Sequence, residues 1–374
     1  MRVLFFGDYS NLHACLAKEL RKRGHEVCVI SDGGRYMDTE KDILLDRKPG
    51  KAGAFLYLYK VWRLVPSLRG YDVVQLINPH FLHLKPTKLR YFFDILKRNN
   101  RSIFLTLAGD DYFFVRSCLD GEMFRFSEFK IGNTLTPNER LTHSGEKWTQ
   151  PALKEYGEYV YENIDGAMSV LPEYDMAARP VLGDKVAFTN IPVDLEELPY
   201  SVPDISGKIN IFIGIRQEMI IQKGTGILQN ICKELEQEMP DKCSVTCVRN
   251  LPLKEYLRKM RESHIVLDQL YSYSPGTNGF QAMALGKATG TGAEPEYYRY
   301  INEPDTSAVI PLSPLCSPSE IKDRLRDLIL NPTKIQEMGA KGRRLVAMHN
   351  DVKTVADKFI KHWQSGINLL SHDA

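Results

Sequence analysis

The chain has 374 residues, of which 43% are hydrophobic and 26% charged, and this balance is typical of a globular protein of about two domains. The 49 Lys and Arg residues nearly cancel the 47 Asp and Glu residues, and the net charge of +2 argues against a nucleic-acid-binding protein. No apolar run is long enough to span a membrane, and the seven scattered cysteines lack the histidine partners of a metal site. Composition therefore predicts a soluble, cytoplasmic protein that binds no metal ion.

The first half of the chain alternates between strand and helix patterns. An apolar run at 3–6 ends at Gly7, leucines recur every four residues from Leu12 to Leu20, and a second apolar run begins at Val27. This opening predicts a strand, a helix and a parallel strand, with Gly7 in a loop that faces the ligand site of such folds. Further strands are predicted at 73–77, 103–107 and 166–171, and helices at 88–97 and 173–181. Residues 111–165 show no clear period.

A proline-rich stretch with Pro192, Pro199 and Pro203 predicts a hinge, after which the alternation resumes. Strands are predicted at 209–214, at 244–248 and from 265, and helices at 225–238, 253–261, 278–285, 318–330, 333–348 and 352–367. The two runs predict two doubly wound, Rossmann-like parallel sheets, the N-terminal domain covering 1–198 and the C-terminal domain 205–348. Such sheets bind ligands at the carboxyl ends of their strands.

The clearest site pattern is DQLYSYSPGTNGFQAMALGK at 268–287, where a buried strand leads through a glycine loop into a helix. Thr277 or Asn278 can cap that helix, and the free N–H groups that follow Gly276 then favour a bound phosphate. The alternative interpretation is that the loop needs small residues for structural reasons alone.

Two cations follow the first strand of the second half. Arg216 comes directly after an apolar strand, and Lys223 precedes a helix, where a cation is electrostatically unfavourable. An anion between them would remove this conflict, because Arg216 can bind a diphosphate through two hydrogen bonds and Lys223 adds a point charge. The alternative is two solvated surface charges.

From about Asn190 onward, the chain resembles the retaining, family 4 (group 1) glycosyltransferases of the GT-B fold. The resemblance rests on GIR at 214–216, KG at 223–224, NIPVD at 190–194 and QAMALGK at 281–287. It implies two Rossmann-like domains that face each other across a cleft, and a helix at 351–370 that crosses back to the first domain. It also implies a nucleoside-diphosphate sugar as donor substrate, with no further cofactor.

Both glutamates of the family motif are replaced in this chain. The second falls on Gln281, which keeps an acceptor for a ribose hydroxyl but loses the charge. The first lies eight positions earlier and falls on Tyr273, which can contact a sugar or base but cannot act as a carboxylate. The resemblance therefore implies nucleotide binding, whereas the loss of both carboxylates weakens the expectation of turnover.

Further candidates lie at other strand ends. Glu294, in a loop that the family places near the donor, is a candidate ligand for base or sugar, or belongs to a plain surface turn. In NPHFLH at 78–83, His80 or His83 can orient a sugar hydroxyl, unless the ring is simply solvated. Asp110 or Asp111 can bind sugar hydroxyls or cap a helix.

Basic and aromatic residues interleave at 59–69 and 88–98, a pattern that fits peripheral contact with the inner face of a membrane. The alternative is a helix whose aromatic residues pack on the sheet while its cations face water. The resemblance as a whole implies a glycosyltransferase of glycan biosynthesis that acts with retention on a saccharide or lipid-linked acceptor. The alternatives are a sugar-nucleotide epimerase on the same fold and a catalytically silent binding or scaffold protein.

Overall fold

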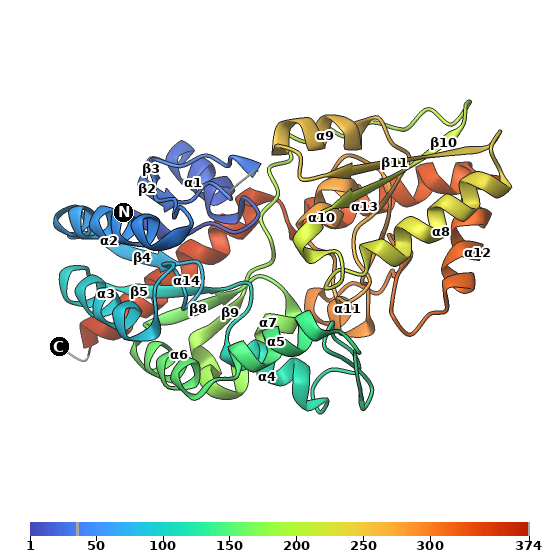
Figure 1. Cartoon of the computed structure of the whole chain (residues 1–374). Coiled ribbons are helices and arrows are strands. Elements are labelled where there is room, and N and C mark those ends of the chain that lie inside the picture. Colours follow the sequence, from blue (N-terminus) through green and yellow to red (C-terminus); the bar gives the residue numbers. More distant parts are fainter. Residues whose placement is uncertain (35–36, 373–374) are drawn as a thin grey trace. The chain divides into compact units, whose positions relative to one another are not determined.

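The computed structural model describes residues 1–34 and 37–372 and divides the chain into two compact units (Figure 1). The first unit comprises 1–117, 144–192 and the helix that begins at Val352, and the second comprises 118–143 and 193–351. The predicted boundary near 198–205 is therefore displaced to Pro192, and the chain passes between the units four times rather than twice. The reason is that the segment 118–143 packs with the second unit, although it lies within the first half of the sequence.

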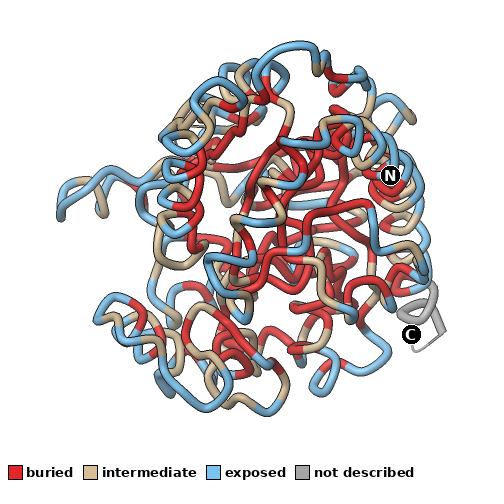
Figure 2. The backbone as a smooth tube through the Cα atoms, turned by 90° about the vertical axis from the view of Figure 1, so that its right-hand side faces the viewer, coloured by how far each residue is buried: buried red, intermediate tan, exposed pale blue. Residues whose placement is uncertain are grey.

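The sheet of the first unit has seven strands in the order β3-β2-β1-β4-β5-β8-β9, with neighbouring strands parallel. Its strands are β1 (Arg2–Phe6), β2 (Glu26–Ser31), β3 (Ile43–Leu44), β4 (Val73–Leu76), β5 (Ile103–Leu107), β8 (Gly166–Ser169) and β9 (Val186–Phe188). The central strands β4 and β5 are buried along their whole length, as expected for continuous apolar runs covered on both faces. Figure 2 shows buried backbone in the interior and exposed segments around it. The strand order reverses between β1 and β4, which is the switch point of a doubly wound sheet.

The helices of the first unit include one that returns from the end of the chain. They are α1 (Leu12–Lys22), α2 (Gly50–Leu64), α3 (Pro86–Asn99), α6 (Pro151–Asn163), α7 (Pro172–Leu182) and α14 (Val352–His372), with short 3-10 turns at Val65–Ser67 and Gly183–Lys185. Helices α4 (Tyr112–Asp120) and α5 (Glu139–Trp148) belong in part to each unit, since the chain changes unit after 117 and after 143. Helix α14 packs on α1 and β8, and its Trp363 is fully buried. The residues 111–165, which show no clear period, form α4, a hairpin, α5 and α6.

The second unit is built on a five-stranded parallel sheet in the order β11-β10-β12-β13-β14. Its strands are β10 (Ile209–Ile215), β11 (Cys243–Arg249), β12 (Ile265–Leu267), β13 (Ala288–Thr291) and β14 (Ile310–Pro311), and β6 (Lys130–Ile131) and β7 (Thr134–Leu135) form a separate antiparallel hairpin. Its helices are α8 (Thr225–Glu238), α9 (Leu253–Arg261), α10 (Thr277–Ala284), α11 (Pro295–Ile301), α12 (Pro318–Leu330) and α13 (Thr333–His349), with a 3-10 turn at Gln217–Met219. The predicted class, two Rossmann-like parallel α/β sheets, is confirmed. Among the described residues, no helix has the length and apolarity that crossing a membrane requires.

Candidate functional site

The strongest candidate site lies at the switch point of the second sheet, where the strand order reverses between β10 and β12. Arg216 follows β10 and Asp268 follows β12, so both lie at carboxyl ends of neighbouring strands. The Arg216 side chain is 43% exposed, and its Nε lies 3.9 Å from a carboxylate oxygen of Glu218. Lys223 Nζ lies 3.5 Å from Oδ1 of the buried Asp268. The anion expected near Lys223 is thus supplied, at least in part, by the chain itself.

The N-terminus of α10 is held by the same carboxylate. The N–H of Gly276 donates to Asp268 Oδ2 at 3.2 Å, and a Cβ at Gly276 would lie only 3.0 Å from that oxygen. The prediction that Thr277 or Asn278 caps this helix is wrong, because Gly276 occupies the cap position and Thr277 is already helical. An anionic ligand at this helix end therefore meets the Asp268 charge, and the nearby cations must offset it.

Two buried oxygens close to α10 have no hydrogen-bond partner in the described part of the chain. They are Oε1 of Gln281, on α10 itself, and Oγ1 of Thr291, at the end of β13. A Cβ at Gly279, in the first turn of α10, would lie 3.3 Å from Asp268 Oδ2 and 3.5 Å from this Thr291 oxygen. Leaving such an acceptor unpaired costs about 1–3 kcal/mol, so a ligand hydroxyl that donated to it would be favoured. Asp268 and Thr291 are site residues that the sequence did not single out, although Asp268 directly follows the buried strand β12 and Thr291 ends the buried strand β13.

Tyr273, which stands at the position of the family's first glutamate, is covered by the segment 118–143. Its hydroxyl accepts hydrogen bonds from the N–H groups of Arg125 and Phe126, at 2.5 and 3.3 Å. The Phe126 ring stacks on the tyrosine ring, with a centroid distance of 4.6 Å. Burial raises the pKa of the Tyr273 hydroxyl. Its catalytic role stays a prediction, while both its ring and its hydroxyl have structural partners.

Glu294 belongs to the same cluster. The guanidinium of Arg125 lies 2.5 Å from a carboxylate oxygen of Glu294 and 3.0 Å from one of Glu296. Glu294 is thus held by a residue from a segment about 170 positions earlier in the chain, and the sequence carried no signal for this pairing. The arrangement leaves the second Glu294 oxygen as a candidate acceptor for a ligand.

In the first unit, one asparagine joins the two strand-end loops that carry His80 and Asp110. The amide of Asn78 donates to the backbone oxygens of Ala108 and Asp110, at 2.8 and 3.2 Å. Its Oδ1 accepts the N–H of His80 at 2.8 Å. The structure therefore brings these two predicted residues together at the carboxyl ends of β4 and β5.

The ionisation of both residues is shifted by burial. Burial, helped by the positive charge of Lys147, lowers the pKa of His80 to about 4, so the imidazole is neutral near pH 7. Burial and the charge of Asp111 raise the pKa of Asp110 to about 6, against the effect of Lys147. Neither ring nitrogen of His80 has a hydrogen-bond partner among the described residues. Lys147, on α5, is the third member of this cluster, and the sequence did not reveal it.

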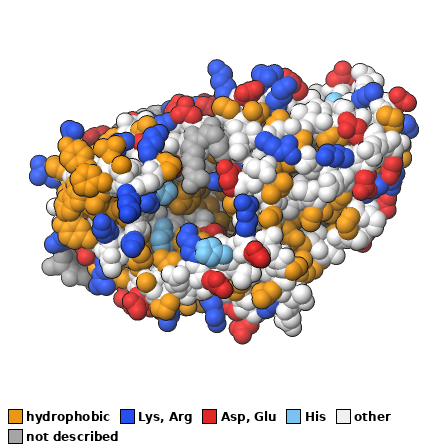
Figure 3. Space-filling view, viewed as in Figure 1, with side chains coloured by type: hydrophobic (Ala, Val, Ile, Leu, Met, Phe, Trp, Pro, Cys, Tyr) orange, Lys and Arg blue, Asp and Glu red, His pale blue; other side chains and the backbone are white. Residues whose placement is uncertain are grey.

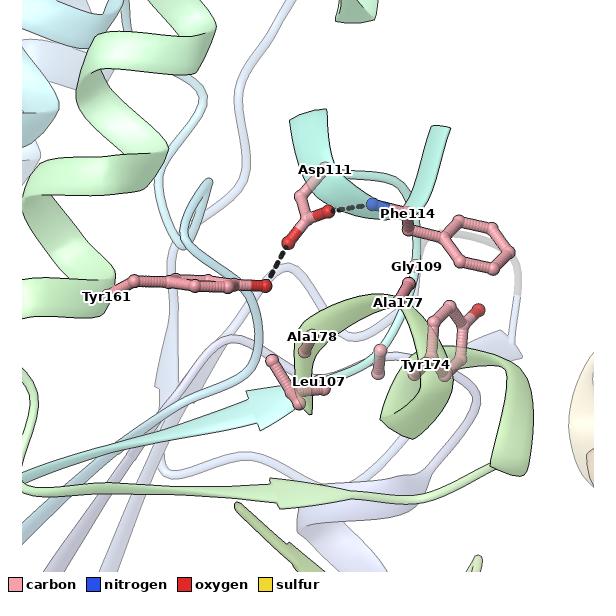
Figure 4. A pocket seen from close by; sticks show the side chains of 9 residues that line it. Leu107, Gly109, Asp111, Phe114, Tyr161, Tyr174, Ala177 and Ala178 are labelled. Atoms are coloured by element: carbon pink, nitrogen blue, oxygen red, sulfur yellow. Dashed lines mark hydrogen bonds between the residues drawn. The ribbon is translucent and has the colours of Figure 1, made fainter. Parts of the chain in front are cut away.

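Two other candidates have clear structural roles. Asp111 caps α4 by accepting the N–H of Phe114 at 2.8 Å, and it accepts the hydroxyl of Tyr161 at 2.8 Å (Figure 4). These residues line a small pocket of the first unit. Gly7 has a φ of 86°, and a Cβ there would lie 2.2 Å from the Ile77 side chain, so the position requires glycine.

We expect replacement of His80 by Gln to remove a pH dependence of stability. Between pH 6.5 and about 4 the unfolded histidine takes up a proton and the buried one does not, so the wild type loses free energy of unfolding as the pH falls. The loss relative to His80→Gln should approach ~1.4 kcal/mol per pH unit within this window. Urea unfolding from pH 7.5 to 4 measures it, and identical pH profiles for the two proteins would contradict the shift.

Comparison with known proteins supports the fold. Neither a protein-family model nor a curated protein sequence matches the chain. Solved structures match it over nearly its whole length. Sucrose-phosphate synthase from Thermosynechococcus elongatus has 12% identity and a TM-score of 0.62, with 97% of this chain and 98% of that one covered. HepE from Anabaena, in complex with UDP-glucose, has 13% identity and a TM-score of 0.61, with 98% and 100% covered. WaaG, described as a glycosyltransferase involved in lipopolysaccharide biosynthesis, has 13% identity and a TM-score of 0.55, with 96% and 98% covered. The chain has the GT-B glycosyltransferase fold.

Proposed function

We propose that this protein is a glycosyltransferase that transfers a sugar from a nucleoside-diphosphate sugar to a saccharide or lipid-linked saccharide, with retention of configuration. The observation that carries the proposal is the pair of cations, Arg216 and Lys223, at the switch point beside the N-terminus of α10. That HepE is described in complex with UDP-glucose supports a UDP-sugar as the first donor to test. That WaaG is described as acting in lipopolysaccharide biosynthesis supports a saccharide acceptor.

The proposed chemistry is mainly electrostatic. Arg216 and Lys223 offset the charge that develops on the leaving diphosphate, and we propose that they do so without a bound metal ion. The unpaired oxygens of Gln281 and Thr291 accept hydrogen bonds from ribose or sugar hydroxyls. Glu294, held by Arg125, offers a carboxylate oxygen in the loop between the carboxyl end of β13 and α11.

A second function is favoured by a separate observation, the burial of Tyr273 beneath Phe126. With neither family glutamate present, the protein can bind a nucleotide sugar without turning it over. Incubation with UDP-glucose and detection of released UDP or free sugar separates the two functions. Release that depends on Arg216 supports the transferase, and stable binding without release supports the silent binding protein.

The nucleotide site is tested by thermal unfolding with UDP, GDP, ADP and their sugars. A ligand at 100 times its Kd should raise the free energy of unfolding by about 2.7 kcal/mol. We expect Arg216→Ala to weaken binding about 10- to 100-fold, because a charged hydrogen bond is worth about 1.5–3 kcal/mol. Stability without ligand should hardly change, since the side chain is 43% exposed.

Arg258→Ala is the matched control. Arg258 lies on α9 of the same unit, is 55% exposed and pairs with Glu262 at 2.7 Å, so its removal should leave the nucleotide shift intact. A full shift in Arg216→Ala would show that the diphosphate binds elsewhere. The absence of a shift with every nucleotide would contradict both the transferase and the silent binding protein. Contact with a membrane, where a lipid-linked acceptor would be met, depends on a different surface of the protein.

A further inference from the structure

Helix α2 of the first unit carries apolar residues on two opposite faces. Its inner face is formed by Tyr57 and Val61, which are buried. Phe55, Tyr59 and Trp62 follow the i, i+4, i+7 spacing of a helical stripe, yet they are 76%, 51% and 46% exposed. Apolar residues with this spacing normally pack against a hydrophobic core. Here the three side chains on the outer face of the helix are exposed to solvent instead.

The exposed stripe continues onto α3. Tyr91 is 47% exposed, and its ring lies 5.5 Å from that of Trp62. Figure 3 shows hydrophobic side chains gathered in this part of the first unit, with Lys and Arg side chains among them. Contiguous exposed patches of large apolar residues mark interaction sites, whereas isolated ones do not. We call the outer faces of α2 and α3 at Phe55, Tyr59, Trp62 and Tyr91 the aromatic patch.

The chain's positive charge is concentrated around the aromatic patch. Residues 47–69 include six Lys and Arg and no Asp or Glu, although two of them, Lys48 and Lys60, pair with the preceding Asp46 at 3.0 and 2.8 Å. Residues 85–101 include six with one acid, Asp94. Asp94 accepts a hydrogen bond from the Tyr159 hydroxyl at 2.6 Å. Since the whole chain has a net charge of only +2, the remainder is net acidic. The near-neutral total therefore hides an excess of cations in these two segments.

Two of these cations share the outer face of α2. Lys51 precedes Phe55 by one turn, and Arg63 lies 5.9 Å over the ring of Tyr59. Both are exposed, and neither has an acidic partner among the described residues. Helix α2 itself, GKAGAFLYLYKVWRL, contains no Ser, Thr, Asn, Gln, Asp or Glu. The face thus consists of aromatic groups and cations, without carboxylates, amides or aliphatic hydroxyls, and this composition complements an apolar boundary that carries negative charge.

We propose that the aromatic patch docks on an anionic lipid bilayer, with the Phe55, Tyr59 and Trp62 rings at the acyl boundary and Lys51 and Arg63 on lipid phosphates. Aromatic rings beside Lys and Arg on one surface helix are the composition of interfacial binding, and each cation near an anionic surface adds attraction. Docking itself follows from this surface alone. Its consequence, that a lipid-linked acceptor is met at the membrane, rests on the proposed function.

The test is flotation of the full-length protein with vesicles of phosphatidylcholine, with and without phosphatidylglycerol, at about 0.15 M salt. We expect binding to the anionic vesicles only. Lys51→Glu/Arg63→Glu should lower it at least about 25-fold, because each cation near the surface contributes roughly fivefold. Phe55→Ser/Tyr59→Ser/Trp62→Ser should abolish it, and quenching of tryptophan fluorescence by brominated lipid should be lost in Trp62→Phe.

Matched controls lie on the exposed surface elsewhere. Lys334→Glu/Arg344→Glu reverses two exposed cations of α13, and Val181→Ser/Leu315→Ser/Leu330→Ser removes three exposed apolar side chains. Both should float like the wild type. Equal loss in these controls, no flotation of the wild type, or self-association that disappears in the patch variants without vesicle binding would overturn the proposal. Nucleotide-induced thermal shifts of the patch variants should match those of the wild type, so failure of docking and failure of the proposed function are separate results.

Discussion

Replacing Tyr273 by Ala is expected to lower the free energy of unfolding of the second unit by about 3–5 kcal/mol, as for other buried aromatic residues. The variant removes the ring on which Phe126 stacks and the oxygen that accepts two backbone N–H groups. The segment 118–143 is held through these contacts. In Tyr273→Ala, the amides of this segment should therefore exchange with solvent faster than those of the sheet. Hydrogen exchange with mass spectrometry measures both effects.

Tyr273→Phe is the control that separates ring from hydroxyl. It keeps the stacking and leaves the N–H groups of Arg125 and Phe126 without their acceptor, for a loss of about 1–3 kcal/mol. Unchanged exchange of 118–143 in Tyr273→Ala would mean that this segment is held mainly by other contacts. The ion pairs of Arg125 with Glu294 and Glu296 are partly exposed and contribute less.

Replacing Trp363 by Ala is expected to lower the free energy of unfolding of the first unit by about 3–5 kcal/mol. Trp363 is fully buried, and its indole N–H donates to Gln75 Oε1 at 2.8 Å, in the central strand β4. The same Gln75 donates to Thr106 Oγ1 at 2.9 Å, so the helix from the chain's end is tied to two strands. Faster exchange should appear in α1 and β8, on which α14 packs, and not in β10 or β12.

Trp363→Phe should lose less, about 1–3 kcal/mol, because it fills most of the space but leaves Gln75 Oε1 without a donor. Equal exchange in α1 for Trp363→Ala and the wild type would contradict the docking of α14 on the first unit. Arg216→Ala, which changes one residue of the second unit and is expected to affect nucleotide affinity alone, serves as the control for both Trp363 variants.

Local signals in the sequence placed many elements well. The helices Thr225–Glu238, Leu253–Arg261 and Pro318–Leu330 have the predicted bounds. Both the apolar period of each helix and the Pro, Gly or polar residues that bound it are local signals in the sequence. The site at the carboxyl ends of β10 and β12 was also indicated, since a charged residue directly after a buried strand is conspicuous in sequence. The helix α2 was missed, because apolar residues on both of its faces hide the period of one.

The sequence by itself determined the two parallel α/β halves and the cations at the switch point of the second, because these depend on residues close together in the chain. Only the tertiary structure decided that Asp268 rather than Thr277 or Asn278 holds the start of α10. It also decided that Arg125 reaches Glu294, and that the boundary between the units is crossed four times. The first depends on how the loop between Asp268 and Gly276 folds back on itself, which residue types alone do not specify. The other two depend on contacts between residues distant in sequence, for which composition and periodicity carry no signal.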